Sequence, residues 1–289
     1  MIFLGTGAAE GFPNPFCSCE PCKRALSSND KRLKRRRSAL LFDEHSMIDF
    51  GPDVLYACSE YGCSLAALKN VFITHTHDDH LSLWNYIYIG MSITPVQKIN
   101  MYLSPAAFAW VKKAEEHMLA IAERGSAEYA ELETVFTRYT AVPLMPYKEV
   151  AIDDMRVMPL LGRHTGFAAG EQAFNYLIEK NEETLLYASD TGTFYEETYT
   201  ALADKRLTTL VIEGTFGQKR LPAGAGHLDQ FALCEVIDRL IAQWTVTDST
   251  RIYITHVAHH SGYTHYDYEA FLQAKYGARA FVAYDGLRI

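Results

Sequence analysis

The sequence predicts an α/β domain in which two β-sheets are sandwiched between helices. Apolar runs of strand length alternate with helical patterns along the chain, in two similar halves. Candidate ligand side chains fall at the ends of predicted strands, and no low-complexity linker divides the 289 residues. We therefore expect a single domain, residues 1–289, with its functional site along one edge of the sheets.

Short apolar runs in the first half predict strands that lead into polar clusters. These strands cover residues 2–4, 38–42, 46–50 and 71–74. A helix is expected over residues 53–63, because Pro52 stands where the first helical turn tolerates proline. A further helix is expected to begin at Leu81.

A helical insert of about residues 104–140 follows the next predicted strand, residues 98–103. Within residues 105–124, apolar side chains share one helical face and charged side chains lie off it. The apolar face consists of Phe108, Val111, Ala114, Met118 and Ile121. Residues 128–138 extend the insert as a second helix or a strand.

The second half repeats the alternation of strands and helices. Strands are expected over residues 150–159, 173–179, 184–189, 207–213 and 251–255. A hairpin turn joins the second and third of these strands. A helix is expected over residues 230–244, with Asp229 as its N-cap.

Composition indicates a globular enzyme and argues against several other classes. Hydrophobic residues make up 48% of the chain and charged residues 21%. The net charge of −8 argues against nucleic acid as the main partner, and it remains negative if metal ions and thiolates are counted. No apolar run is long enough for a membrane span, and the first residues lack a signal-peptide pattern. We therefore expect the cytoplasm, where the six cysteines serve as metal ligands or buried thiols.

The stretch His75-Thr76-His77-Asp78-Asp79-His80 is the strongest functional signal. It reads H-x-H-x-D-H and follows the predicted strand ending at Thr74. Imidazoles and carboxylates packed this densely are costly to bury without a partner, and both are natural ligands of divalent metals. His75 and His77 point the same way, and Asp79 and His80 can face a second ion.

Three cysteines near the N-terminus form a second metal-binding pattern. Cys17, Cys19 and Cys22 read C-x-C-x-x-C, which is a zinc half-site that lacks its fourth ligand. A redox pair of Cys19 and Cys22 is the alternative. The basic run from Lys31 to Arg37 is either a solvated loop or a source of arginines that face a phosphate-bearing substrate.

These motifs resemble the metallo-β-lactamase superfamily of metal-dependent hydrolases, whose four-layer αββα sandwich the predicted elements fit. The chain is most similar to the branch of phosphoribosyl cyclic phosphate phosphodiesterases. That branch combines C-x-C-x-x-C and H-x-H-x-D-H with a late T-H-x-x-H, here residues 255–259, and a terminal aromatic-Asp-Gly, here residues 284–286.

The resemblance implies a complete set of ligands. One catalytic ion would be held by His75, His77 and His164, and the other by Asp79, His80 and His256, with Asp190 bridging the two. His259 would complete the structural zinc site. His164 and Asp190 follow predicted strands, and each is a weak signal without the resemblance.

The resemblance also implies His227 and Asp79 as catalytic residues, with His227 not a metal ligand. Two divalent ions close together lower the pKa of a shared water and neutralise the charge of a phosphodiester. Manganese and zinc both suit His and Asp ligands. We expect a small cyclic or nucleotide-like phosphodiester as substrate, with His227 protonating the leaving group.

Two features leave other functions open. The insert looks longer than the connection usual in this branch, and it could be a lid, a specificity element or the surface of a homodimer. Gly11-Phe12-Pro13 also resembles the B protein of pyrroloquinoline quinone biosynthesis. The alternatives are therefore hydrolysis of a thioester, a lactone or an RNA end on the same metals, or a non-enzymatic carrier.

Overall fold

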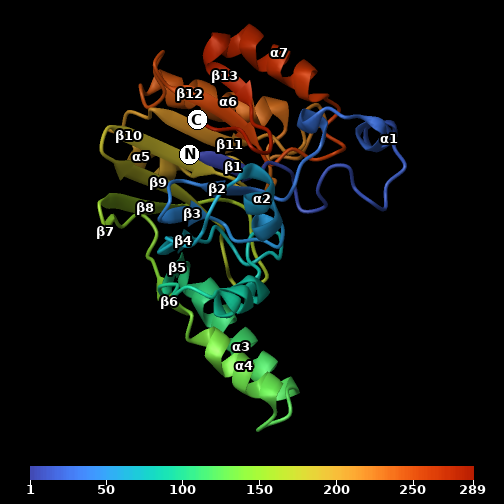
Figure 1. Cartoon of the computed structure of the whole chain (residues 1–289). Helices are drawn as coiled ribbons and strands as arrows, with labels where there is room; N and C mark the ends of the chain where they lie inside the picture. Colours follow the sequence, from blue (N-terminus) through green and yellow to red (C-terminus); the bar gives the residue numbers. More distant parts are fainter.

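Two β-sheets lie face to face at the centre of the molecule, which we describe from a computed structural model of residues 1–289 (Figure 1). The first sheet has six strands in chain order: β1 (Ile2–Gly5), β2 (Ala39–Leu41), β3 (Ser46–Ile48), β4 (Asn70–Phe72), β5 (Ile99–Leu103) and β6 (Tyr139–Pro143). Its first three strands are antiparallel, and β3 to β6 run parallel.

The second sheet has seven strands and reverses the chain order, from β13 at one edge to β7 at the other. Its strands are β7 (Val150–Ile152), β8 (Met155–Leu161), β9 (Phe174–Lys180), β10 (Glu183–Ala188), β11 (Thr209–Glu213), β12 (Arg251–Thr255) and β13 (Ala280–Val282). Strands β7 to β10 form antiparallel pairs, and β10 to β13 run parallel.

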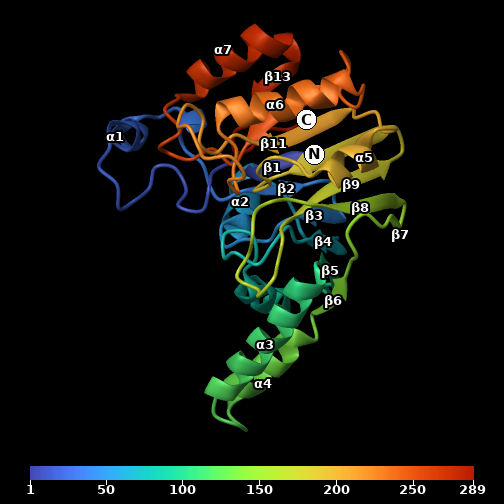
Figure 2. The ribbon, with the colours of Figure 1, turned by 180° about the vertical axis from the view of Figure 1, so that it is seen from behind.

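Helices cover the outer face of each sheet (Figures 1 and 2). The first sheet packs against α2 (Val54–Tyr61), α3 (Pro105–Ile121) and α4 (Ala127–Phe136). The second sheet packs against α5 (Glu196–Leu202), α6 (Gln230–Ala242) and α7 (His265–Tyr276). A short helix α1 (Glu20–Ser27) lies in the N-terminal loop beside the sheets.

Apolar side chains along the central strands point alternately to the two faces, so both faces of each sheet are packed. On β4, Val71 packs under the helices and Phe72 packs between the sheets. On β11, Val211 points between the sheets while Leu210 and Ile212 point towards α6 and α7. Successive strand side chains face opposite ways, so strands that are apolar at every position need cover on both sides. The predicted αββα sandwich is confirmed.

Several predicted elements need correction. Residues 150–159 are not one strand but the hairpin β7–β8, which turns at Asp153 with φ of 52°. The segment after residue 81 is a 3₁₀ helix, Leu83–Met91. Strand β6 and the helices α1, α5 and α7 were not predicted, because their apolar positions are short or irregularly spaced. None of the helices is both long and apolar enough to cross a lipid bilayer.

The insert consists of the helices α3 and α4, which pack together and project from the body (Figures 1 and 2). Its predicted apolar face is only partly right. Val111 and Met118 are buried in the core, whereas Ile121 is 70% exposed near the end of the hairpin. Glu115 is buried instead, because it accepts a hydrogen bond from Tyr139 and pairs with Lys112.

Removing residues 119–129 and closing the hairpin with a short glycine linker should change the oligomer size or the substrate preference. The deletion removes the exposed Ile121 but keeps the buried Val111 and Met118, so the body should still fold. The hairpin projects from the body, so its tip is placed to contact a second subunit or a bound substrate. Sedimentation velocity and turnover of a panel of phosphodiesters measure both effects. Identical results for the shortened and full-length chains would assign the hairpin tip no role.

Candidate dinuclear metal centre

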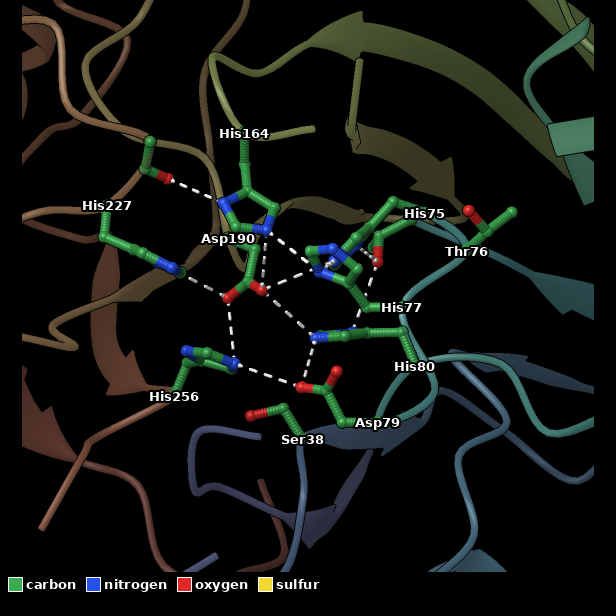
Figure 3. Close-up of polar contacts among 12 residues, drawn as sticks. Ser38, His75, Thr76, His77, Asp79, His80, His164, Asp190, His227 and His256 are labelled. Carbon is green, nitrogen blue, oxygen red and sulfur yellow. Dashed lines mark hydrogen bonds and ion pairs between the residues drawn. The ribbon is translucent and has the colours of Figure 1, made fainter. Parts of the chain in front are cut away.

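The predicted ligands come from the strand ends of both sheets and converge in one place (Figure 3). His75 to His80 follow β4 of the first sheet, while His164, Asp190 and His256 follow β8, β10 and β12 of the second. Asp190 and His256 adopt the left-handed backbone region, with φ of 42° and 54°. That conformation costs on the order of 1–3 kcal/mol for a residue other than glycine and is typical of functional sites.

One group of ring nitrogens gathers around a carboxylate oxygen. Nδ1 of His77 lies 2.9 Å from Nε2 of His75 and 3.2 Å from Nε2 of His164. The Oδ2 atom of Asp190 lies 3.5 Å from the first of those Nε2 atoms and 3.6 Å from the second. Two imidazole nitrogens this close either share one proton in a hydrogen bond or face a common cation, and three of them around one carboxylate oxygen are a ligand set that suits a cation.

A second group shares the same aspartate. Nε2 of His80 lies 3.0 Å from Oδ2 of Asp79 and 3.3 Å from Oδ2 of Asp190. Nε2 of His256 lies 2.9 Å from Oδ1 of Asp190 and 3.7 Å from Oδ2 of Asp79. Asp190 therefore touches both groups, which is the arrangement expected of a bridging ligand.

Four buried atoms of these side chains indicate that the site suits metal ions. Oδ2 of Asp79, Nε2 of His80, Oδ1 of Asp190 and Nε2 of His256 are buried and face one another within ion-pair distance, but none of them forms a hydrogen bond. Buried polar atoms are almost always paired, and leaving several unpaired at one point is costly. A divalent cation would satisfy all of them, so the donor set fits metal ions. The assignment of individual ligands stays a prediction.

Hydrogen bonds to the ring nitrogens that point away from the site orient the ligand histidines. Asp49 is fully buried and accepts from Nδ1 of His80 at 2.6 Å, which turns Nε2 towards the site. Thr215 contacts Nδ1 of His256 at 3.0 Å and donates its proton to Glu213. Contacts of this kind fix the tautomer of a ligating histidine. Sequence reasoning missed Asp49, Thr215 and Glu213. Asp49 and Glu213 are carboxylates at strand ends, which is the same weak signal that Asp190 gives, but the family resemblance pointed to Asp190 alone.

His227 sits at the edge of this cluster. Its Nδ1 lies 3.1 Å from Oε2 of Glu213 and 3.9 Å from Oδ1 of Asp190, and no contact engages Nε2. Burial disfavours the charged ring, but the two carboxylates outweigh it and raise the pKa of His227. Glu213 therefore orients the ring and favours its charged form, and Nε2 is left free, as a proton donor requires.

The N-terminal cysteines meet the predicted fourth ligand. Cys17, Cys19, Cys22 and His259 bring their ligand atoms within 4.8 Å of one another. Nδ1 of His259 lies 3.6 Å from Sγ of Cys19 and 3.5 Å from Sγ of Cys22. The contact with His259 lowers the pKa of Cys19 to about 6, so this thiol is readily a thiolate. Three thiolates and one imidazole are a common structural zinc set.

The basic run is only partly a solvated loop: Lys31 and Lys34 are exposed, whereas its arginines are partly or fully buried. Arg35 is buried and donates to Thr6 and to the carbonyl of Ala283. Arg37 pairs with Asp53. Together with Arg36, whose backbone nitrogen donates to Asp285 of the terminal aromatic-Asp-Gly motif, these residues tie the first strands to the last loop. Sequence alone did not reveal these partners, because they are far away along the chain.

The fold is that of the metallo-β-lactamases, and the clustered histidines and carboxylates at its strand ends fit metal ions. A family profile described as Anti-Pycsar protein Apyc1 matches residues 37–227, from the second strand to the histidine beside the metal centre. The chain belongs to this family.

Solved structures of the same fold match nearly the whole chain. A diphosphatase from the PhnP family is 18% identical, with a TM-score of 0.72, and the match covers 100% of this chain and 95% of that one. Zinc-bound PqqB from Methylobacterium extorquens is 15% identical, with a TM-score of 0.70 and coverage of 99% and 98%. Both families are those that the sequence motifs resemble, and the likeness establishes the fold.

One curated relative is named for a transferase activity and not for hydrolysis. An octanoyltransferase from Porphyromonas gingivalis (strain ATCC BAA-308 / W83) is 28% identical over 191 residues. The match covers 60% of this chain but only 33% of the relative. The chain thus spans about a third of the length of this relative.

Proposed function

We propose that the protein is a metal-dependent phosphodiesterase that hydrolyses a small cyclic or nucleotide-like phosphodiester. The single observation that carries this proposal is the placement of Asp190 between two groups of possible ligand atoms, one of which includes four buried atoms that form no hydrogen bond. A bridged pair of divalent ions is suited to phosphodiesters, whose attack and departure both involve charged oxygens. We further propose Mn²⁺ or Zn²⁺ at this centre and Zn²⁺ at the cysteine site.

In this reaction, residues of the chain would have distinct roles. The metal ions, when bound, would activate the attacking water and neutralise charge on the phosphate. Asp190 would hold the two ions together, while Asp49 and Thr215 would keep two of the ligand rings in place. His227 would donate its Nε2 proton to the departing oxygen, and Glu213 would keep that ring oriented.

Turnover of bis(p-nitrophenyl) phosphate tests the proposal. Protein freed of metal with a chelator should be inactive, and added Mn²⁺ or Zn²⁺ should restore release of p-nitrophenol. A screen of cyclic phosphodiesters under the same conditions would then identify the substrate class. No metal-dependent hydrolysis of any phosphodiester would reject the proposal and favour a carrier.

Replacing His227 with alanine should lower turnover by about 10²–10⁴-fold on esters with poor leaving groups, which is the usual contribution of a general acid. The loss should be much smaller on p-nitrophenyl esters, because p-nitrophenolate departs without a proton. Metal content should not change. Rates on alkyl and p-nitrophenyl esters, together with elemental analysis, measure these effects.

A matched control is available in His260, which neighbours the same phenylalanine ring, Phe216, but does not face Asp190. His260→Ala should leave both rates nearly unchanged. Equal losses on both ester types in His227→Ala would argue against proton donation. Loss of a metal ion in that variant would make His227 a ligand, which its position within 4.8 Å of Asp190, Glu213 and His256 makes geometrically feasible.

A second candidate function is acyl hydrolysis, favoured by the partial match to an octanoyltransferase. An attacking water generated at the same centre could cleave an octanoyl ester or thioester. Release of octanoate from an octanoyl thioester, compared with phosphodiester turnover under identical metal loading, separates the two functions. The six cysteines are unpaired, which fits the reducing cytoplasm we propose for either activity.

A further inference from the structure

The loop between β8 and β9, residues 162–173, carries His164 and meets the start of the metal motif. It closes at its base, where the backbone nitrogen of Ala173 donates to the carbonyl of His164 at 2.8 Å. The next backbone nitrogen, that of Phe174, donates to the carbonyl of Thr74 at 2.8 Å. The loop therefore joins the second sheet to the first immediately before His75.

A buried carboxylate, that of Glu171, fastens this loop to the metal motif. The residue is only 2% exposed. Its Oε1 atom accepts from the backbone nitrogen of Thr76 at 3.1 Å. Its Oε2 atom accepts from the hydroxyl of Thr76 and from the backbone nitrogen of Ala168 at 3.2 Å. The same hydroxyl oxygen accepts from the backbone nitrogens of Phe167 and Ala168 at 2.9 and 3.1 Å.

These contacts act on the backbone between two predicted ligands. Thr76 separates His75 from His77, and its side chain points away from the ligand cluster (Figure 3). On the loop, Phe167 packs edge-on against the ring of His77, with the ring centroids 4.7 Å apart and an interplanar angle of 68°. Glu171 therefore holds both the backbone of this ligand pair and the loop segment that packs on one of its rings.

Two features set this contact apart from ordinary loop packing. Glu171 forms no ion pair, so only hydrogen bonds from Thr76 and from its own loop stabilise the buried carboxylate. Burial of such a group without a cation is costly. The second feature is Gly166, where an added Cβ would lie 1.9 Å from Oε2 of Glu171 and 2.8 Å from Oγ1 of Thr76. A larger residue at position 166 would displace the contact.

We infer that Glu171 is a positioning residue of the metal centre, which sets the H-x-H motif and the His164 loop at the spacing that one ion requires. It acts through the backbone of Thr76 and not by touching an ion or a substrate. The ligands that it places are those proposed for the first ion, namely His75, His77 and His164. The inference deepens the proposed function and rests on it for the two metal ions.

Calorimetric titration of Mn²⁺ tests the inference without turnover, in protein freed of metal at the His and Asp site. Glu171→Gln keeps the size of the side chain but replaces one acceptor oxygen with an amide, which cannot accept from Ala168. We expect the dissociation constant of one ion to rise about 10-fold or more, within the 10–100-fold loss usual for groups that orient ligands. That of the other ion should change much less. His77→Ala should lose the same binding step, which identifies the ion.

Variants of Thr76 approach the contact from its other side. Thr76→Val removes the hydroxyl at nearly the same volume and should weaken the same ion, whereas Thr76→Ser keeps the hydroxyl and should retain the affinity. Combining Thr76→Val with Glu171→Gln should cost little more than either change alone, because both remove one shared contact. If Glu171→Gln does not fold, Thr76→Val and Gly166→Ala test the same contact.

Glu115→Gln is the matched control, because Glu115 is also buried and accepts a hydrogen bond from Tyr139 in the insert. It should leave the affinity for both ions unchanged. Equal weakening of both ions in Glu171→Gln, with a lower melting temperature, would make Glu171 merely structural and overturn the inference. Unchanged affinity for both ions would overturn it as well.

Amide hydrogen exchange of the metal-free protein reports on the contact without any ion. In Glu171→Gln, peptides that contain residues 76 and 167–168 should exchange faster, because their amides lose acceptors held by this contact. In Glu115→Gln the same peptides should exchange at the unsubstituted rate. Unchanged exchange in Glu171→Gln would show that the carboxylate does not hold the loop.

The outcome is separable from that of the proposed function. A protein that binds two ions and hydrolyses phosphodiesters, but whose Glu171→Gln variant binds both ions normally, would overturn only the role of Glu171. Selective loss of one ion in that variant, without hydrolysis of any phosphodiester by the unsubstituted protein, would retain the positioning role and reject the activity. Fewer than two ions in the unsubstituted protein would reject both.

Discussion

Replacing Asp190 with alanine should abolish metal-dependent phosphodiester hydrolysis. Asp190 contacts His75 and His164 through Oδ2, and His256 through Oδ1, so it is the one side chain common to both ligand groups. Losing a group that only orients a ligand already costs about 10–100-fold in activity or metal affinity. Removing the bridge should cost more, because neither ion would keep its full set of ligands.

The measurement combines initial rates on bis(p-nitrophenyl) phosphate with metal content after dialysis. We expect a rate at the background level and fewer than two ions retained at the His and Asp site. Asp78→Ala is the matched control, because Asp78 lies in the same motif but outside both ligand groups. Full activity in Asp190→Ala would refute the two-metal interpretation.

The layers of the fold could be predicted because they follow from local patterns. Continuous apolar runs such as Val71-Phe72-Ile73 must be covered on both faces, and this is how the structure places them. The two metal clusters could be located because histidines, aspartates and cysteines spaced this densely at the ends of strands and in loops are typical of metal sites. The grouping of His164, Asp190 and His256 with the H-x-H-x-D-H motif came from the family resemblance, and the structure brings these side chains together.

Other features could not be predicted, because they depend on contacts between distant parts of the chain. The partners of Arg35 and Arg36 lie 248 and 249 residues away, so the sequence could not show that these two arginines are engaged while Lys31 and Lys34 of the same run are exposed. Burial of Glu115 depends on Tyr139, which follows a segment whose secondary structure was ambiguous.

Replacing Cys19 with serine should release one zinc ion per chain and lower the melting temperature. A structural zinc is bound most tightly by thiolates, and its binding contributes directly to folding stability. A change of 1 kcal/mol shifts the melting temperature of a domain somewhat smaller than this one by about 2–4 °C. Loss of several kcal/mol should therefore lower it by more than about 5 °C.

The same substitution should weaken retention of the catalytic metals, though to a lesser degree. His259 lies three residues after His256, in a loop that is also fastened by a hydrogen bond from Val257 to Thr6 at 3.0 Å. Loss of zinc would free one anchor of this loop and leave the other. Glu10, whose Oε1 lies 3.5 Å from Nε2 of His259, would keep that ring in place. We therefore expect the catalytic ions to dissociate faster in dialysis, while activity at saturating metal is largely kept.

The competing interpretation makes Cys19 and Cys22 a redox pair and leaves His259 without a role. Zinc content would then be the same in Cys19→Ser and in the unsubstituted protein, and only the response to oxidants would change. Cys63→Ser is the matched control, because Cys63 is partly buried and far along the chain from this cluster. Elemental analysis of the three proteins decides between the interpretations. An undiminished zinc count with full activity in Cys19→Ser would rule out a structural zinc here, since a closed four-coordinate site cannot lose a thiolate without losing affinity.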